Sequence, residues 1–198
     1  MERLPRLSSK VLWAALLLGC SVPLAAQDAA GTLSPAARSL YTARLADNAA
    51  GNFAGLAASP LLGVPSVPVL DAVVTWDRLR RDAYLGPFAE YAGFLTRHSD
   101  WPQAAVIRRQ AEKAITDQTP MAERLAYFRA VPPQTALGKF RMAEALLATG
   151  QPQPARAMAR DAWDSAGLDA EQESRLLALF GSSLTPADHA ARADRLLW

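Results

Sequence analysis

The chain has 198 residues, 51% of them hydrophobic, and its mean hydropathy is close to zero. This composition excludes wholesale disorder and a polytopic membrane protein, and the length suits one sizeable domain or a short array of repeats. The formal net charge is +2 at pH 7, and Glu2, Arg3, Arg6 and Lys10 together account for it. The neutral remainder offers no concentrated basic field, so we expect no binding to nucleic acid.

The N-terminus has the layout of a secretory signal peptide over residues 1–26. A basic lead-in is followed by the apolar run VLWAALLLG at residues 11–19, and then by the small residues Ala25 and Ala26. The apolar run is shorter than the roughly 20 residues that a membrane-spanning helix needs. We therefore expect the protein to be exported.

The only cysteine, Cys20, has two interpretations. If cleavage follows Ala26, Cys20 leaves with the signal peptide. The stretch LLGC at residues 17–20 also resembles a bacterial lipobox, in which Cys20 would carry a lipid anchor. Either way, the sequence predicts neither a disulfide framework nor a cysteine metal site.

A first helix is expected from Pro35 to about Asn48, because Ser34 is a good N-cap and proline suits the first helical position. Residues 49–69 are predicted to be a linker, since glycine and proline recur there. Residues 27–69 thus form an N-terminal helix and linker, and the pattern changes from residue 70 onwards.

Apolar residues recur at helical spacing in each later segment, and none shows a convincing period of two. The stripes are Phe88, Tyr91, Ala92 and Leu95; Ala104, Ile107, Ala111, Ala114 and Ile115; Met121, Leu125 and Phe128; Ala136, Phe140, Ala143, Leu146 and Leu147; and Ala155, Met158, Ala159 and Ala162. Each stripe predicts a one-sided helix with a polar back. The sequence therefore predicts an all-α fold.

The helix starts are regularly spaced. Pro87, Pro120, Pro152 and Pro186 lie 33, 32 and 34 residues apart, with one extra helix between each pair. A helix-pair period of about 34 residues is typical of tetratricopeptide-like arrays. Because such helices cannot bury their apolar faces alone, we expect a curved solenoid of antiparallel helix pairs over residues 70–198.

The last predicted helix opens with Thr185 and Pro186 and runs to residues 196–198, Leu-Leu-Trp, without a stop signal. Solenoids need a polar capping repeat to shield the final apolar face. We therefore expect the chain to be cut short at its C-terminus, or to close against another structure.

Conventional catalytic and cofactor sites are not predicted. His98 and His189 lie on separate helical hairpins without partners at metal-ligand spacing, and are interpreted as ordinary loop or surface residues. The glycines of residues 49–69 lack the strand that precedes a phosphate loop. Gly181 and the serines after it lack the context of a nucleophile elbow. We expect no cofactor and no metal.

The triplet Gln-Glu-Ser at residues 172–174 resembles the acid-bearing triplet of enzymes that cut peptidoglycan. Asp169 is predicted to be the N-cap of this helix, so Glu171 and Glu173 are already favoured by the positive helix end. A glycosidic acid also needs a cleft and groups that stabilise the transition state, and only 25 residues follow Glu173. We therefore reject Glu173 as a catalytic acid and assign no catalytic residue.

Three stretches carry a family resemblance: residues 88–115 with their HSDWP turn, residues 167–181, and the final LTPADHAARADRLLW. Over residues 75–198 the chain resembles the N-terminal α-superhelical region of soluble lytic murein transglycosylases of the alphaproteobacterial type. The resemblance implies a later lysozyme-like domain that carries the catalytic glutamate. In that family, the later domain cleaves the bond between N-acetylmuramic acid and N-acetylglucosamine and leaves a 1,6-anhydro product. Glu173 matches only the triplet of the family's catalytic motif.

Two groups of side chains have both a structural and a functional interpretation. One group is aromatic and is expected to be core in preference to a platform for sugars: Trp76, Tyr84, Phe88, Tyr91, Phe94 and Trp101. The other is charged and is expected to be a solvated face in preference to a groove for anionic murein peptides: Arg78, Arg80, Arg81, Arg97, Arg108 and Arg109 with Asp77, Asp82, Glu90 and Glu112.

The expected function is that of the non-catalytic, superhelical part of a periplasmic lytic transglycosylase, inactive alone. Its expected partners are the glycan strand and its own C-terminal lysozyme-like domain, with outer-membrane association if Cys20 is lipidated. The alternative is a periplasmic repeat protein that acts as a protein–protein adaptor.

Overall fold

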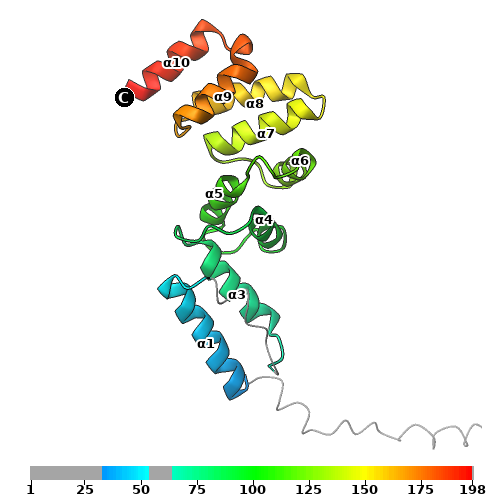
Figure 1. The fold of residues 1–198 in the computed structure, drawn as a ribbon, viewed down its shortest axis with the longest axis vertical. Helices are drawn as coiled ribbons and strands as arrows, with labels where there is room; N and C mark the ends of the chain where they lie inside the picture. Colours follow the sequence, from blue (N-terminus) through cyan, green and yellow to red (C-terminus); the bar gives the residue numbers. More distant parts are fainter. Residues whose placement is uncertain (1–32, 54–63, 198) are drawn as a thin grey trace, which may run out of the picture.

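The computed structural model describes residues 33–53 and 64–197, and the predictions for the signal peptide and for Cys20 lie outside these residues. The described residues form only helices and their connections, which confirms the all-α prediction. Figure 1 shows the helices following one another along an elongated body, with α1 and α10 at opposite ends. The elements are α1 (Pro35–Ala50), α3 (Pro68–Leu79), α4 (Phe88–Arg97), α5 (Ala104–Ala114), α6 (Met121–Ala130), α7 (Ala136–Ala148), α8 (Pro152–Asp164), α9 (Ala170–Phe180), the short 3-10 helix η2 (Gly181–Ser183) and α10 (Pro186–Leu197).

Helix α1 begins as predicted, because the Ser34 hydroxyl accepts a hydrogen bond from the Ala37 amide at 3.1 Å. It ends at Ala50, two residues beyond Asn48, and is capped by Gly51, whose φ of 78° is the left-handed conformation that glycine tolerates. Helix α3 begins at Pro68, inside the predicted linker. Proline breaks the interior of a helix but suits its first position, so Pro68 starts α3.

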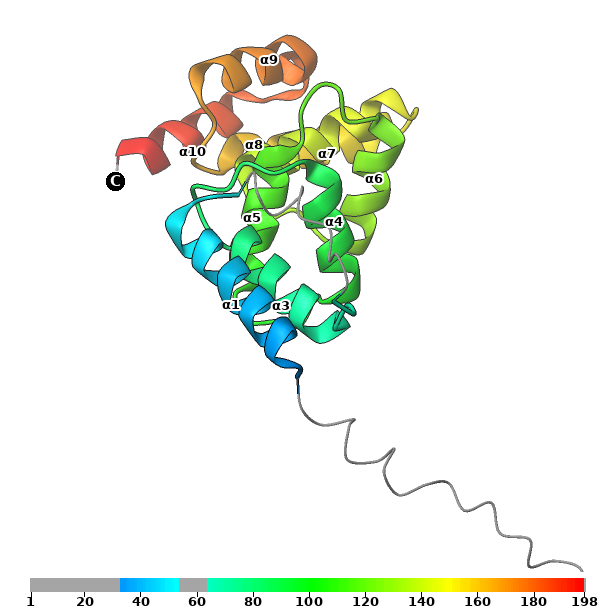
Figure 2. The same ribbon diagram turned by 60° about the horizontal axis from the view of Figure 1, so that its bottom comes forward.

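Helices α1 and α3 lie side by side (Figures 1 and 2) and are joined by buried polar contacts. The Tyr41 hydroxyl donates to the Asp71 carboxylate at 2.9 Å and accepts from the Val67 amide at 2.9 Å. The Asn48 amide group donates to the Val74 carbonyl at 2.9 Å. These bonds fix the position of α1 along α3.

Most packing joins helices that are neighbours in sequence: α3 with α4, α4 with α5, α6 with α7, α7 with α8 and α8 with α9. In addition, α7 packs on α5, and α10 packs on α8. The apolar stripes fill two core clusters, one centred on α4 and α5 and the other on α7 and α8. Met142 on α7 is packed against both clusters.

The predicted helix starts at Pro152 and Pro186 are confirmed, as is the N-cap at Asp169. One stripe assignment is wrong at its edge, because Leu147 is 38% exposed. Leu147 lies at the margin of its apolar stripe, where a helix of 3.6 residues per turn rotates the side chain toward solvent. Gly181 ends α9, but its φ of −55° lets the chain continue into η2.

Candidate binding pockets along the helix stack

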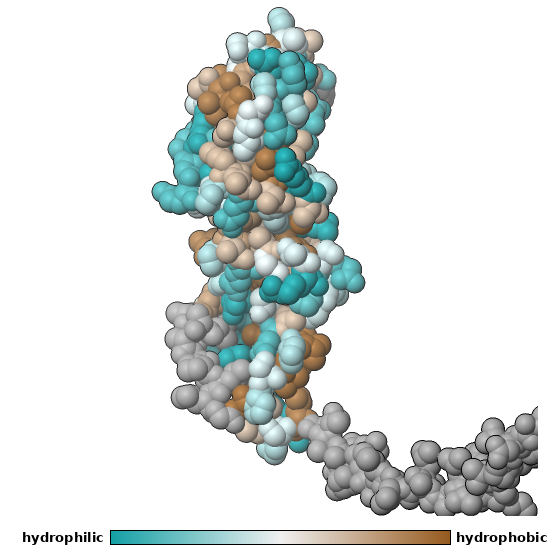
Figure 3. Space-filling view, turned by 90° about the vertical axis from the view of Figure 1, so that its right-hand side faces the viewer, coloured by the Kyte–Doolittle hydropathy of each residue, from teal (hydrophilic) through white to brown (hydrophobic). Residues whose placement is uncertain are grey.

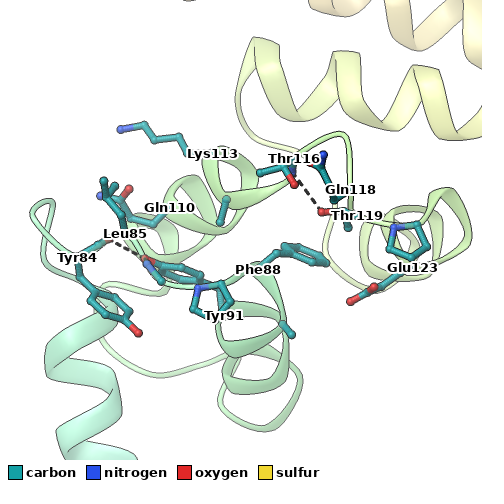
Figure 4. A pocket seen from close by; sticks show the side chains of 15 residues that line it. Tyr84, Leu85, Phe88, Tyr91, Gln110, Lys113, Thr116, Gln118, Thr119 and Glu123 are labelled. Carbon is teal, nitrogen blue, oxygen red and sulfur yellow. Dashed lines mark hydrogen bonds between the residues drawn. The ribbon is translucent and has the colours of Figure 1, made fainter. Parts of the chain in front are cut away.

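A pocket of about 580 Å³ opens where the connection before α4 meets the connection between α5 and α6 (Figure 4). We call it the Tyr91 pocket. Its volume falls within the range of small-molecule sites in proteins. The lining includes Tyr84, Leu85, Gly86, Pro87, Phe88, Tyr91, Gln110, Lys113, Thr116, Gln118, Thr119 and Glu123.

Hydrogen bonds hold both sides of the Tyr91 pocket in place (Figure 4). The Tyr91 hydroxyl donates to the Tyr84 carbonyl at 2.9 Å, and burial raises the pKa of Tyr91, which keeps it protonated as a donor. On the other side, the Thr116 amide donates to the Thr119 hydroxyl at 3.2 Å. The pocket is therefore built between two braced loops.

Two further pockets, of about 630 and 360 Å³, lie on α3 and share Trp101 as a wall. The larger also has Thr75, Arg97 and His98 in its lining, and the smaller has Trp76. We call them the Trp101 pockets. Figure 3 shows hydrophobic residues gathered near this end of the body.

The Trp101 ring is held in a fixed orientation. It meets Phe94 edge to face at 5.6 Å and Trp76 at 6.5 Å between ring centroids. The Trp76 indole donates to the Pro102 carbonyl at 2.6 Å, and the Arg80 guanidinium stacks 4.6 Å above the Trp76 ring. A wall of this kind offers a rigid aromatic surface to a ligand.

The core interpretation is confirmed for Phe88, Tyr91 and Phe94, which are at least 94% buried in the first core cluster. The other three aromatic residues are only partly buried against this cluster. Trp101 and Trp76 combine this packing with exposure to the Trp101 pockets.

The prediction of a solvated charged face is wrong for Asp77 and Glu112. Glu112 is completely buried and accepts hydrogen bonds from the Gln134 amide at 2.6 Å and the Thr135 amide at 2.8 Å. Asp77 is 6% exposed and pairs with Arg80 and Arg81 one turn later, at 2.6 and 2.9 Å. These carboxylates brace backbone and helix ends, which a charge pattern alone does not reveal.

The two histidines lie far apart in the fold. His98 is half-buried, with its ring 4.8 Å from those of Phe94 and Trp101, so it forms part of a Trp101 pocket. His189 is exposed on α10, 5.4 Å from the Trp163 ring. Within residues 33–53 and 64–197, no group of three or more His, Cys, Asp or Glu side chains could hold a metal ion.

Glu173 forms an ion pair with Arg192 of α10. Arg192 is 6% exposed, stacks 4.3 Å from the Trp163 ring and donates to the Trp163 carbonyl at 2.6 Å. Asp169 caps the helix together with Gln172 in a capping box. Glu173 thus connects α9 to α10, and it lines none of the pockets described above.

The sequence interpretation missed the buried Arg124. Its guanidinium donates to the Thr116 and Thr119 carbonyls at 2.7 and 3.0 Å and to the Glu144 carboxylate at 3.2 Å. It thereby closes the same loop that forms one side of the Tyr91 pocket. The signal in the sequence is its place beside Leu125 in the apolar stripe, where a charged residue needs a buried partner.

Comparison with known protein families, with curated proteins and with solved structures found no match to the chain. Among the helices of the described residues, none is both long and apolar enough to cross a membrane.

Proposed function

We propose that the chain is the non-catalytic helical part of a periplasmic lytic transglycosylase, and that it holds a peptidoglycan glycan strand. In this proposal the helices form a curved solenoid of antiparallel, tetratricopeptide-like pairs. The sequential packing of the helices and the family resemblance of residues 75–198 support it.

The observation that carries the proposal is the aromatic wall of Trp101 between two pockets. The flat apolar face of a pyranose ring stacks well on an indole, which presents a broad and rigid apolar surface. Arg97, His98 and Thr75 add polar groups beside this wall that can bond sugar hydroxyls. Two adjoining pockets suit a ligand that extends over several sugar units.

Cleavage of the glycosidic bond belongs, in this proposal, to a lysozyme-like domain outside these residues. The helical part contributes by holding the strand, since positioning of a substrate converts binding energy into rate. Glu173 has no role in the chemistry, because its carboxylate is paired with Arg192.

The test is co-sedimentation of the purified chain with insoluble peptidoglycan sacculi. Trp101→Leu keeps apolar volume against Phe94 but removes the aromatic face, so we expect apparent affinity to fall about fivefold, as loss of about 1 kcal/mol of ring stacking implies. His189→Leu, which removes an exposed ring outside the Trp101 pockets, is the matched control and should bind normally. Equal binding by the two variants would contradict the proposal.

A second assay addresses catalysis. Renatured in a gel that contains peptidoglycan, the chain should leave no cleared band. A lytic band from the chain alone would overturn the assignment of cleavage to another domain.

A protein–protein adaptor is the second candidate. Leucines on α9 and α10 favour it, because they are exposed and could receive an apolar partner surface: Leu177 39%, Leu179 45%, Leu196 61% and Leu197 78%. An adaptor would stay in the supernatant of the sacculus assay, whereas a glycan-holding region would sediment.

A further inference from the structure

Two opposite charges stand at the rim of the Tyr91 pocket. Lys113 comes from the end of α5 and Glu123 from the first turn of α6, and both side chains are exposed. Neither forms an ion pair or a side-chain hydrogen bond with any other residue in the part of the chain that the structure describes. Both charges are therefore available to a ligand.

These charges lie on different sides of the pocket. Figure 4 shows Lys113 extending past Leu85, whereas the Glu123 carboxylate lies beyond Phe88 on the side of Thr119. A ligand with a single charge would satisfy one group and meet repulsion from the other. A ligand with a carboxylate at one end and an ammonium group at the other satisfies both.

The space between the charges suits a peptide backbone. Gln118 is exposed at the rim, and its amide can both donate and accept. The Gln110 amino group donates to Asp82 at 2.6 Å, which leaves its carbonyl oxygen as an acceptor for an N–H group. Beneath them, Phe88 and Tyr91 form an apolar floor for a small side chain.

We propose that the Tyr91 pocket binds a short peptide that carries both a free carboxylate and a free ammonium group. A neutral sugar would form no ion pair with Lys113 or Glu123, whereas a short peptide can pair with both. The inference deepens the proposed function and rests on it for the source of the peptide, which is the stem peptide of peptidoglycan.

The test is isothermal titration calorimetry of the chain with the tripeptide Ala-Glu-Lys and with its acetylated, amidated Ala-Gln-Gln analogue, which has no charges. We expect the charged tripeptide to bind and the neutral analogue to bind at least about fivefold more weakly. Lys113→Gln and Glu123→Gln should each weaken binding of the charged tripeptide by about threefold to fivefold, the upper range for an exposed ion pair.

Matched controls are Arg109→Gln on α5 and Glu171→Gln on α9, which remove the same charges from exposed positions outside the pocket. Both should bind the tripeptide as the unaltered chain does. Equal affinity for the two peptides, or equal losses in the control variants, would overturn the inference.

The outcomes also separate this inference from the proposed function. If the tripeptide does not bind while sacculi still sediment the chain through Trp101, the peptide site is wrong and the glycan role survives. If the tripeptide binds with the expected charge dependence but sacculi do not sediment the chain, the peptide site is supported and the peptidoglycan role is overturned.

Discussion

Arg124 is completely buried and donates a hydrogen bond to the Glu144 carboxylate at 3.2 Å, which joins α6 to α7. Glu144 also pairs with Arg141 at 3.0 Å and with Arg175 of α9 at 2.7 Å. One carboxylate thus contacts three guanidinium groups from three helices, and it is the countercharge of Arg124, whereas Arg141 and Arg175 also pair with Asp117. Removal of a single partner from a buried ion pair leaves an uncompensated charge, which costs more than the pair itself contributes.

Glu144→Gln should therefore lower the free energy of unfolding by about 3–5 kcal/mol. The cost arises because Arg124 stays buried without its countercharge. Urea unfolding followed by circular dichroism measures the change. Glu171→Gln, an exposed carboxylate in the first turn of α9, should change stability by less than about 1 kcal/mol, the usual contribution of a carboxylate at a helix N-terminus. A loss below about 1 kcal/mol in Glu144→Gln would contradict the buried-charge argument.

Asp77 predicts a dependence of stability on pH. Burial opposes its charged form, but hydrogen bonds from Arg80 and Arg81 outweigh burial and hold the pKa of Asp77 below its usual value. A lowered pKa in the folded state stabilises the protein above the unfolded pKa of about 3.9, and this contribution is lost as the pH falls through the folded pKa. In urea unfolding at a series of pH values below about 5, the free energy of unfolding should fall less steeply with decreasing pH for Asp77→Asn than for the unaltered chain. If the free energy of unfolding depended on pH in the same way in both proteins, the role of Asp77 would be contradicted.

Two helical glycines should respond in opposite directions to alanine. A Cβ at Gly138 would overlap the Glu112 carboxylate, which is buried and cannot move without losing its bonds to residues 134 and 135. Gly138→Ala should therefore cost about 1–3 kcal/mol through overpacking. A Cβ at Gly93 meets only the Arg97 guanidinium at 3.7 Å, so Gly93→Ala should stabilise α4 by about 0.5–1 kcal/mol. Thermal melts measure the melting temperatures of the two variants, and a shift of the same sign in both would contradict the packing described at Gly138 and Gly93.

Glu173→Gln tests the position of the Gln-Glu-Ser triplet. The substitution keeps an acceptor but removes the charge that faces Arg192, so we expect about 1 kcal/mol of destabilisation. Binding to sacculi should be unchanged, because Glu173 lies outside the Trp101 pockets. A stability equal to that of the unaltered chain combined with weaker sacculus binding would instead place Glu173 in a ligand site.

The helices could be predicted from the sequence because their signals are local. Proline at the first helical position and apolar stripes at helical spacing fixed the starts of α8 and α10 and most of both core clusters. Pro68 was misassigned to a linker, since a helix start and a helix stop share the same residue type.

The buried charges could not be predicted in the same way, because their partners are remote in sequence. Arg124 and Glu144 are 20 residues apart, and Glu112 and the amide of Gln134 are 22 apart. In a helical pattern each of these residues resembles a member of a solvated face. The Tyr91 pocket was missed for a similar reason, since it combines the connection before α4 with the one after α5.

Met142 on α7 is packed against both core clusters, and α7 contacts α5, α6 and α8. Cooperativity between the two halves of the molecule therefore passes through α6 and α7, because α6 also supplies Phe128 to one cluster and Leu125 to the other. The ion pair between Asp117, in the connection after α5, and Arg175 of α9 adds a direct link across the middle of the molecule. Loosening that begins at α1 or at α10 can spread inward through one neighbour after another, and it reaches the opposite half through this middle segment. Any energetic coupling between the Trp101 pockets and the Glu173 ion pair thus depends on how firmly that segment is held.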